Sequence, residues 1–134
     1  MKCKESSLWD TTYKLDELEV SGPIEGLFTW DEAMSLKLPE GWRVASDADW
    51  TKIEHYFNNN AKKLIKKLGI VFTGFRLRAE VCYIGGSADF WSSSESGTFA
   101  WYRSLYSRDA TVYRDMDTKE LGFSVRCVRD IESQ

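Results

Sequence analysis

Few residues of this chain could perform chemistry. His55 is the single histidine and falls inside a predicted helix, where we expect an ordinary, partly buried side chain. The run Ser92-Ser93-Ser94-Glu95 could supply a hydroxyl and a carboxylate. Nucleophilic catalysis needs a positioned base, however, and the same spacing is typical of a polar turn. We therefore predict no catalytic residues and no enzyme activity.

The cysteines do not form a metal or redox motif. The three are Cys3, Cys82 and Cys127, and no pair has the Cys-x-x-Cys spacing of a structural zinc site. Cys82 and Cys127 suit small apolar positions on strands. A bridge between these two stays open, because the sequence does not give the distance between their Cα atoms. We predict no metal site and no cofactor.

Residues suited to recognition are concentrated between positions 94 and 119. Tyrosine offers a large, stiff contact area at small entropic cost, and serine offers adaptable hydrogen bonds, a composition typical of antibody paratopes. Charged side chains would add selectivity. The predicted ligand-binding residues are Glu95, Tyr102, Tyr106, Arg108, Tyr113, Arg114 and Asp117. For any one of them alone, a solvated sheet face is an equally good interpretation.

Composition restricts the classes of partner. A chain of 134 residues, 43% of them hydrophobic, fits one globular domain with one core. Its 18 basic and 21 acidic residues give a net charge of -3, which offers no general attraction to nucleic acid or anionic lipid. No stretch approaches the roughly 18 apolar residues of a membrane-spanning helix, and no secretory signal is recognisable. We expect a soluble domain that is synthesised in the cytoplasm without a secretion signal.

Capping residues predict the helices that must support these candidates. Thr29 and Glu32 form a capping box that should open a helix over about 29–36. A serine cap with acids in the first turn predicts a second helix over 46–58, with one apolar face. A third is expected over 61–68, with four lysines facing solvent and a glycine terminator.

Strands are expected in the second half of the chain, where the apolar period becomes alternating. Residues 70–72 and 75–83 have this pattern, and in 99–106 the odd and even positions form two distinct faces. Residues 99–106, 110–114 and 122–128 are predicted to be three consecutive antiparallel strands. Their connections are too short for a parallel crossover.

Seven motifs spread over residues 27–129 resemble the Fibrobacter succinogenes major paralogous domain, which is similar to the C-type lectin-like and sulfatase-modifying-factor folds. They follow the order in which the family has them. The motifs are Phe28-Thr29-Trp30-Asp31-Glu32-Ala33, Leu38-Pro39-Glu40-Gly41-Trp42-Arg43, Asp47-Ala48-Asp49-Trp50, Gly74-Phe75-Arg76, Phe90-Trp91-Ser92-Ser93-Ser94-Glu95, Ala100-Trp101-Tyr102-Arg103 and Gly122-Phe123-Ser124-Val125-Arg126-Cys127-Val128.

The resemblance implies an α+β domain of the C-type lectin-like fold. Two main helices would pack on a small twisted antiparallel sheet, with the terminal strands close together and a long loop region on one side. The domain would span 27–130, with an N-terminal arm and first strand over 1–26 in the same unit and a tail over 131–134. Trp42, Trp50 and Trp91 would anchor the core and loops.

The chain departs from the family where function is concerned. Leu38 stands where many members have the cysteine that pairs with the equivalent of Cys127. The calcium-binding motifs of sugar-binding lectins are missing, which implies a calcium-independent module. Formylglycine-generating relatives use two late cysteines, whereas Cys127 is alone here.

We therefore expect a non-enzymatic ligand-binding or adhesion module that recognises a cell-surface protein or glycan. Related folds suggest a phage virion, as a receptor-binding or fibre component, or a cell surface as its setting. A structural decoration protein of a larger particle is the alternative, assembling with its partners or as a homo-oligomer through Trp9, Tyr13 and the N-terminal arm. A degenerate enzyme of the sulfatase-modifying type is the third.

Overall fold

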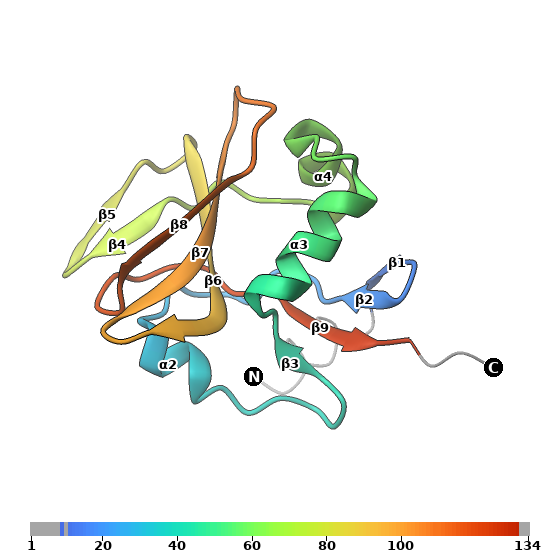
Figure 1. Ribbon diagram of the computed structural model, residues 1–134. Helices are drawn as coiled ribbons and strands as arrows, with labels where there is room; N and C mark the ends of the chain where they lie inside the picture. The colour runs from blue at the N-terminus through green and yellow to red at the C-terminus, as the bar shows by residue number, and fades with distance from the viewer. Residues whose placement is uncertain (1–8, 10, 132–134) are drawn as a thin grey trace.

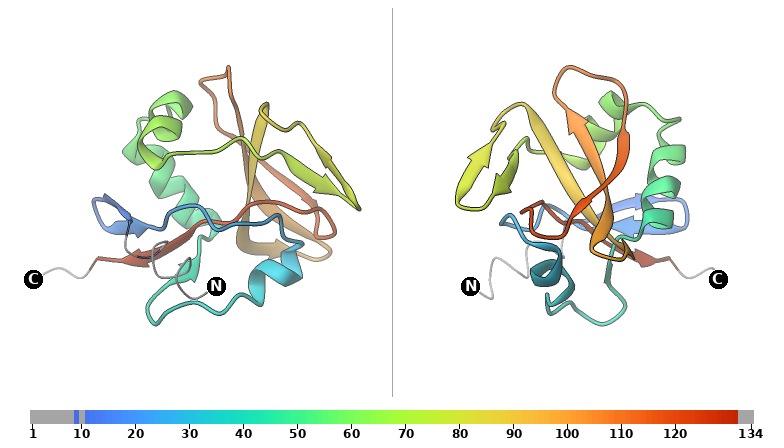
Figure 2. Two further views of the ribbon diagram at one scale, coloured as in Figure 1. Left: turned by 180° about the vertical axis from the view of Figure 1, so that it is seen from behind. Right: turned by 60° about the vertical axis from the view of Figure 1, so that its left-hand side comes forward.

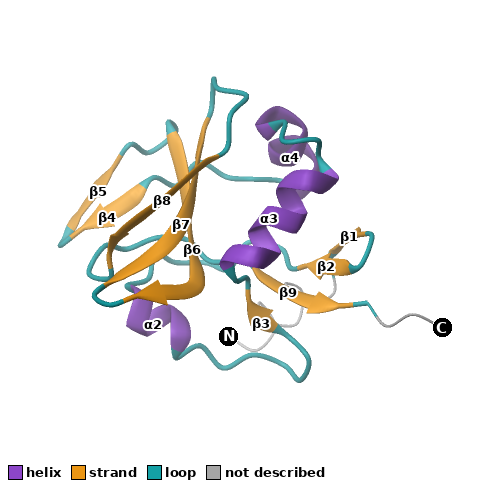
Figure 3. Ribbon diagram, in the orientation of Figure 1, coloured by secondary structure: helices purple, strands orange, loops and turns teal. Residues whose placement is uncertain are grey.

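The computed structural model describes residue 9 and residues 11–131, which fold mainly as β structure (Figures 1 and 3). The first sheet has the strand order β1-β2-β9-β3, and every neighbouring pair is antiparallel. Its strands are β1 (Tyr13–Leu15), β2 (Leu18–Val20), β9 (Cys127–Asp130) and β3 (Arg43–Val44). The pairing of β2 with β9 brings the two ends of the described chain together.

The second sheet has the order β6-β7-β8, and the third is a separate hairpin of β4 and β5. The strands are β6 (Ser87–Ser96), β7 (Phe99–Tyr106), β8 (Tyr113–Thr118), β4 (Phe75–Leu77) and β5 (Glu80–Cys82). Figure 2 shows α3 on one side of the β6-β7-β8 sheet and the β4-β5 hairpin on the other. The sheet is therefore a middle layer.

The structure confirms the predicted helices. Each capping signal involves residues within about one helical turn, so the sequence alone is enough to detect it. The helices are α2 (Trp30–Met34), α3 (Asp47–Tyr56) and α4 (Ala61–Leu68). Both α2 and α3 begin with a complete capping box, at Thr29 and Ser46. Gly69 ends α4 in the left-handed region, with φ of 58°. The four lysines of α4 are exposed, as the pattern predicts.

The expected architecture is wrong. Instead of a C-type lectin-like α+β domain with two main helices on one small sheet, the described residues form nine strands in three sheets and three helices of 5, 10 and 8 residues. Sequence pattern indicated a single strand in the N-terminal segment and none at β3, because β1, β2 and β3 have only two or three residues each. Such short strands form through long-range pairing and leave little periodicity to detect.

Several predicted strands also need correction. Residues 70–72 are not a strand, and 75–83 form a hairpin that turns at Arg78, where φ is 58°. Only the end of the predicted strand 122–128 is regular, and the resulting β9 pairs with β2 and β3 rather than with β8. Ser92 to Glu95 lie in β6 instead of a polar turn. Local alternation identified strand-forming segments but not their partners.

Two groups of buried side chains fill the interior. One surrounds α3 and α4 and includes Trp50 and Leu64, and the other includes Trp91 and Phe123. Trp50 and Trp91 have no solvent-accessible surface, which confirms that they anchor the core. Trp42 is half-buried against the ring of Trp9, with 4.8 Å between ring centroids.

Candidate functional site

The β6-β7-β8 sheet has two faces with different chemistry. Directly paired residues of antiparallel strands point to the same side, so the pairs Tyr102 with Asp115 and Ser104 with Tyr113 define one face. We call this surface the tyrosine face. It carries Asp89, Tyr102, Ser104, Tyr106, Tyr113, Asp115 and Asp117. The opposite face, toward α3, carries Trp101, Arg103, Leu105, Arg114 and Met116.

Two exposed tyrosines meet at the end of the tyrosine face next to the β7-β8 loop. Tyr106 and Tyr113 are 43% and 42% exposed as residues, and their rings pack edge to face with 5.5 Å between centroids. The Tyr113 hydroxyl donates to Oδ2 of Asp109 at 2.5 Å, and Oδ1 of Asp109 accepts from the amide of Thr111. The rings and the loop therefore hold each other in position.

Arg108 lies in the β7-β8 loop, two residues after Tyr106. Its side chain is exposed and forms no hydrogen bond or ion pair with the described residues. A guanidinium in this position can contact a carboxylate, phosphate or aromatic ring of a partner. Of the predicted site residues, the structure brings Tyr106 and Tyr113 into contact, and Arg108 is in the loop that joins their strands.

Tyr102 lies deeper on the same face. Its ring packs on Phe123 at 4.7 Å and on Trp91 at 6.2 Å between centroids, and it is half-buried. Burial, followed by the charges of Asp117 and Asp115, raises the pKa of Tyr102 to about 12. Its ring is mainly a packing element, so the prediction of an exposed ligand contact needs correction.

Aspartates give the tyrosine face an acidic character that sequence reasoning only partly detected. Asp117, a predicted site residue, is half-buried and accepts from the amide of Thr118, and Asp115 is exposed beside it. Asp89 is buried, and its carboxylate accepts from the hydroxyls of Ser104 at 2.6 Å and Ser87 at 2.9 Å. Burial raises the pKa of Asp89 above its usual range. The signal that was missed is the two-residue spacing between Asp89 and Trp91 in β6, which places both side chains on the same side of the strand.

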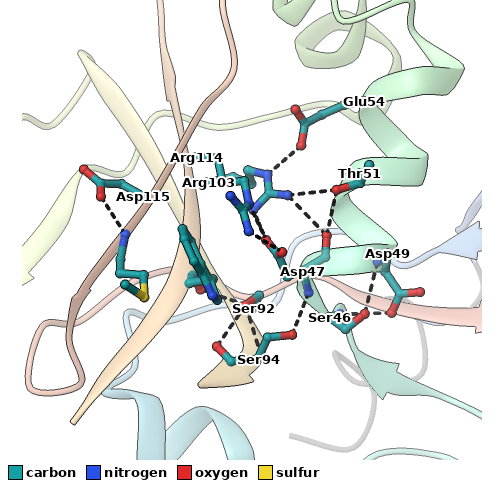
Figure 4. Close-up of polar contacts among 12 residues, drawn as sticks. Ser46, Asp47, Asp49, Thr51, Glu54, Ser92, Ser94, Arg103, Arg114 and Asp115 are labelled. Carbon is teal, nitrogen blue, oxygen red and sulfur yellow. Dashed lines mark hydrogen bonds and ion pairs between the residues drawn. The ribbon is translucent and has the colours of Figure 1, made fainter. Parts of the chain in front are cut away.

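Arg114 points to the opposite face and does not join the tyrosines. Its guanidinium makes two hydrogen bonds to the Asp47 carboxylate, at 3.0 and 2.8 Å, and lies 3.7 Å from the Trp101 ring centroid (Figure 4). The hydrogen bonds from Arg114, and then those from Arg103, hold the pKa of Asp47 below its usual range despite partial burial. Arg114 therefore attaches β8 to the start of α3.

Arg103, on the neighbouring strand β7, also attaches the sheet to α3. Its side chain is fully buried and donates to Asp47 at 2.7 Å, to Glu54 at 2.5 Å and to Thr51 at 3.3 Å (Figure 4). Two carboxylates compensate the buried charge, which is the condition for a stable buried ion pair. The signal for this role was a charged residue on the otherwise apolar side of β7.

Glu95 lies near the other end of the sheet. It pairs with Ala100, whereas Ser87 at the start of β6 pairs with Tyr106, so almost the whole strand separates Glu95 from the tyrosine pair. Its carboxylate accepts from Nζ of Lys119. Glu95 is not part of the same binding surface.

Ser92 and Ser94, which were considered for catalysis, make hydrogen bonds to the backbone. The hydroxyl of Ser92 donates to the carbonyl of Trp101 at 2.8 Å, and that of Ser94 accepts from the amide of Asp47. His55 is exposed, so the expectation of a partly buried histidine is wrong. Within residues 9 and 11–131, no group of three or more His, Cys, Asp or Glu side chains could hold a metal ion.

Neither of the described cysteines forms a disulfide. Cys82 and Cys127 are both free, so the bridge that the sequence left open between them is not formed. Burial raises the pKa of the Cys127 thiol to about 12, which disfavours the nucleophilic thiolate.

No protein-family model, curated protein or solved structure matches this chain. No helix among the described residues is both long and apolar enough to cross a membrane.

The tyrosine face presents groups that could contact a partner. It has two exposed phenol rings in a fixed mutual orientation and an exposed carboxylate at Asp115. Such groups can stack on a partner and exchange hydrogen bonds and charges with it.

Proposed function

We propose that this protein is a ligand-binding module that contacts a protein or glycan partner through Tyr106, Tyr113 and Arg108 and catalyses no reaction. The observation that carries the proposal is the exposed tyrosine pair held in place by Asp109. Tyrosine and arginine contribute most to binding energy at protein interfaces. Two large exposed rings serve no purpose in solubility, and their fixed orientation lowers the entropic cost of binding.

The ion pairs that attach β7 and β8 to α3 favour the same function. Arg103 joins β7 to α3, and Arg114 joins β8 to the same carboxylate of Asp47. A binding surface on strands that are cross-linked to a helix keeps its geometry better than one on an isolated loop.

Charge narrows the class of partner. Asp109 contacts Tyr113, and Asp115 lies two residues further along β8 on the same face, whereas Asp117 pairs with Ala100 near the Glu95 end of the sheet. Carboxylates beside aromatic rings suit basic groups, through ion pairs and cation–π contacts, and they also accept hydrogen bonds from sugar hydroxyls. A protein surface with lysine or arginine, or a glycan rich in hydroxyls, therefore fits this face.

For the setting, we propose display on a phage virion or a cell surface, where the exposed tyrosine pair would meet its partner. The alternative of assembly through the N-terminal arm is less well supported. Trp9 packs on Trp42, and Tyr13 packs against the core around α3. Both aromatic side chains therefore make packing contacts inside the protein, which leaves less of their surface for an assembly partner.

A double variant tests the proposal directly. Tyr106→Ser with Tyr113→Ser removes both rings, and we expect glycan-array or host-cell binding to fall by at least about tenfold, as for loss of a binding hot spot. Thermal unfolding should remain cooperative. Tyr56→Ser is the matched control, because Tyr56 is 40% exposed but lies on α3. Unchanged binding by the double variant would exclude this surface, and assembly lost on deleting residues 1–13 would then favour the structural alternative.

A further inference from the structure

One edge of the β4-β5 hairpin is open. β5 lies at the outside of the molecule, and β4 is its only sheet partner among the described residues (Figures 1 and 2). On the far side of β4, the backbone N–H and C=O of Arg76 both form 2.8 Å hydrogen bonds with Gly122. Arg76 therefore makes no backbone hydrogen bond with Val81, which is its direct partner in β5. The N–H and C=O of Val81 point away from β4, and neither has a hydrogen-bond partner in the part of the chain that the structure describes.

The outer strand of the larger sheet is protected, whereas β5 is not. β8 is the edge of the β6-β7-β8 sheet, and its Met116 and Thr118 amides donate to the preceding carboxylates, Asp115 and Asp117, at 2.8 and 2.7 Å. These amides are occupied by side chains of their own strand, so they are less available to another strand. Charged side chains, proline and bulges are the usual means of protecting an edge. The amide of Val81 has no comparable side-chain acceptor among the described residues.

Large apolar side chains lie in and next to this hairpin. Leu77, Val81, Tyr83 and Ile84 are 50%, 45%, 70% and 74% exposed. Single exposed apolar residues are ordinary, but four within eight positions of the chain are typical of an interaction surface. Tyr83 also has a φ of 59°, which is rare for a bulky residue, and its ring stacks on Phe75 with 5.8 Å between centroids. The backbone at the end of β5 thus holds an aromatic ring at the surface.

We propose that the open edge of β5 pairs with the same edge of a second copy of this chain, forming a symmetric dimer with a four-stranded β4-β5-β5-β4 sheet. Antiparallel pairing about a twofold axis at Val81 gives two hydrogen bonds, because each Val81 donates its N–H to the C=O of the other. In this register Glu80 lies opposite the partner's Cys82. Like charges therefore do not meet directly across the interface.

A second copy fits this edge better than an unrelated peptide. β5 has only three residues, so a peptide strand would gain few hydrogen bonds from it. The twofold pairing also places the partner's Tyr83 opposite Ala79, with Ile84 next to it, so apolar side chains of both copies are covered. Two more strands strengthen the hairpin, since a two-stranded sheet is only marginally stable by itself. The pairing uses a different sheet from the tyrosine pair and does not depend on the proposed function.

The mass of the full chain in solution tests the proposal. We expect light scattering and sedimentation to give twice the 15.5 kDa of one chain as the concentration rises. Val81→Pro removes the outward N–H, which β4 does not use, and proline is tolerated on an edge strand at such a position. Dimerisation should weaken at least about tenfold, as for the loss of two hydrogen bonds. A wild-type protein that stays monomeric up to about 1 mM would overturn the proposal.

Val81→Lys is a second variant that keeps the backbone donor. It brings two like charges together at the twofold axis and should also give a monomer. Tyr56→Lys is the matched control, because Tyr56 is 40% exposed but lies on α3, and it should remain dimeric. Tyr106→Ser with Tyr113→Ser should remain dimeric too, which separates this test from that of the binding surface. A dimer that persists in both Val81 variants would place the interface elsewhere and refute the proposal.

Hydrogen exchange at single amides locates the interface directly. The Val81 amide should exchange more slowly as the protein concentration rises, because the partner strand then accepts its hydrogen bond. The Cys82 amide faces Phe75 of β4 and serves as an internal control, since its exchange should not depend on concentration. Exchange at Val81 that is independent of concentration while the protein dimerises would contradict the edge pairing.

Discussion

Arg103 in the middle strand of the β6-β7-β8 sheet donates a 2.7 Å hydrogen bond to Asp47 in the first turn of α3. The same carboxylate accepts two hydrogen bonds from Arg114 of β8. One acidic residue therefore joins two neighbouring strands to the helix behind them, and this junction supports the hairpin that carries the exposed tyrosines.

Removing Arg103 should destabilise the fold. Arg103→Met leaves Asp47 and Glu54 without their buried partner, and we expect the free energy of unfolding in urea to fall by about 3 kcal/mol, as for one half of a buried ion pair. Arg108→Met is the control, because Arg108 is exposed and makes no polar contact with the described residues. Its effect should be within about 0.5 kcal/mol. Equal stability of the two variants would show that the Arg103 junction is dispensable.

Asp89 should oppose stability at neutral pH. Because its folded pKa is raised by burial, its contribution is fully present below the unfolded pKa, near 3.9, and is lost as the pH rises through the folded value. Asp89→Asn should therefore increase the free energy of unfolding at pH 7 and have less effect near pH 3.

Chemical denaturation across this pH range measures the change. Asp115→Asn, on the exposed part of the same face, should change stability by less than about 0.5 kcal/mol. A gain in Asp89→Asn that is independent of pH would contradict the assigned ionisation.

Tyr113 should control the ionisation of Asp109. The hydrogen bond from the Tyr113 hydroxyl is the main cause of the lowered pKa of Asp109. Tyr113→Phe should move that pKa up toward its usual range, as measured by NMR titration of the side-chain carboxyl. Tyr106→Phe keeps the donor on Tyr113 and should leave the value unchanged. A normal Asp109 pKa in the wild type would mean that the contact does not persist in solution.

Gly74 should be intolerant of a side chain. Its φ is +71°, and an added Cβ would lie 2.0 Å from the carbonyl oxygen of Cys82 in the backbone. We expect Gly74→Ala to lower the free energy of unfolding by about 3 kcal/mol or more, through both strain and displacement of β5.

Gly85 separates these two causes. Its φ is +82°, but a Cβ added there would have no neighbouring atom within 4 Å. Gly85→Ala should therefore cost about 1 kcal/mol, the conformational part alone. Equal effects at both glycines in thermal or urea unfolding would argue against the close approach of β5 to Gly74.

Local signals predicted the helices well and the sheets poorly. Each capping box, at Thr29 and Ser46, joins residues only three positions apart, so both partners of its hydrogen bonds can be read from the local sequence. Alternation likewise separated the two sides of β7. Alternation alone did not indicate the partner of β9, because β2 lies more than 100 residues earlier in the chain and offers only three residues of pattern. The expectation that the terminal strands lie close together came from the family resemblance and agrees with this pairing.

The candidate site shows the same division. Tyrosine and arginine in 94–119 could be identified by residue type, but their grouping depends on strand register. Register places Tyr106 and Tyr113 on one face, turns Arg114 to the other and puts Glu95 near the far end. Tyr102 is half-buried because Phe123, from another part of the chain, packs on its ring.

By itself, the sequence determined where the helices begin, which segments alternate, and which side chains are available for recognition. These properties depend on residues within a few positions of each other, so they can be predicted without knowledge of the fold. Only the tertiary structure decided that Arg103 is compensated and Arg126 is not. That difference depends on which distant carboxylates each guanidinium meets, and long-range packing alone brings such groups together.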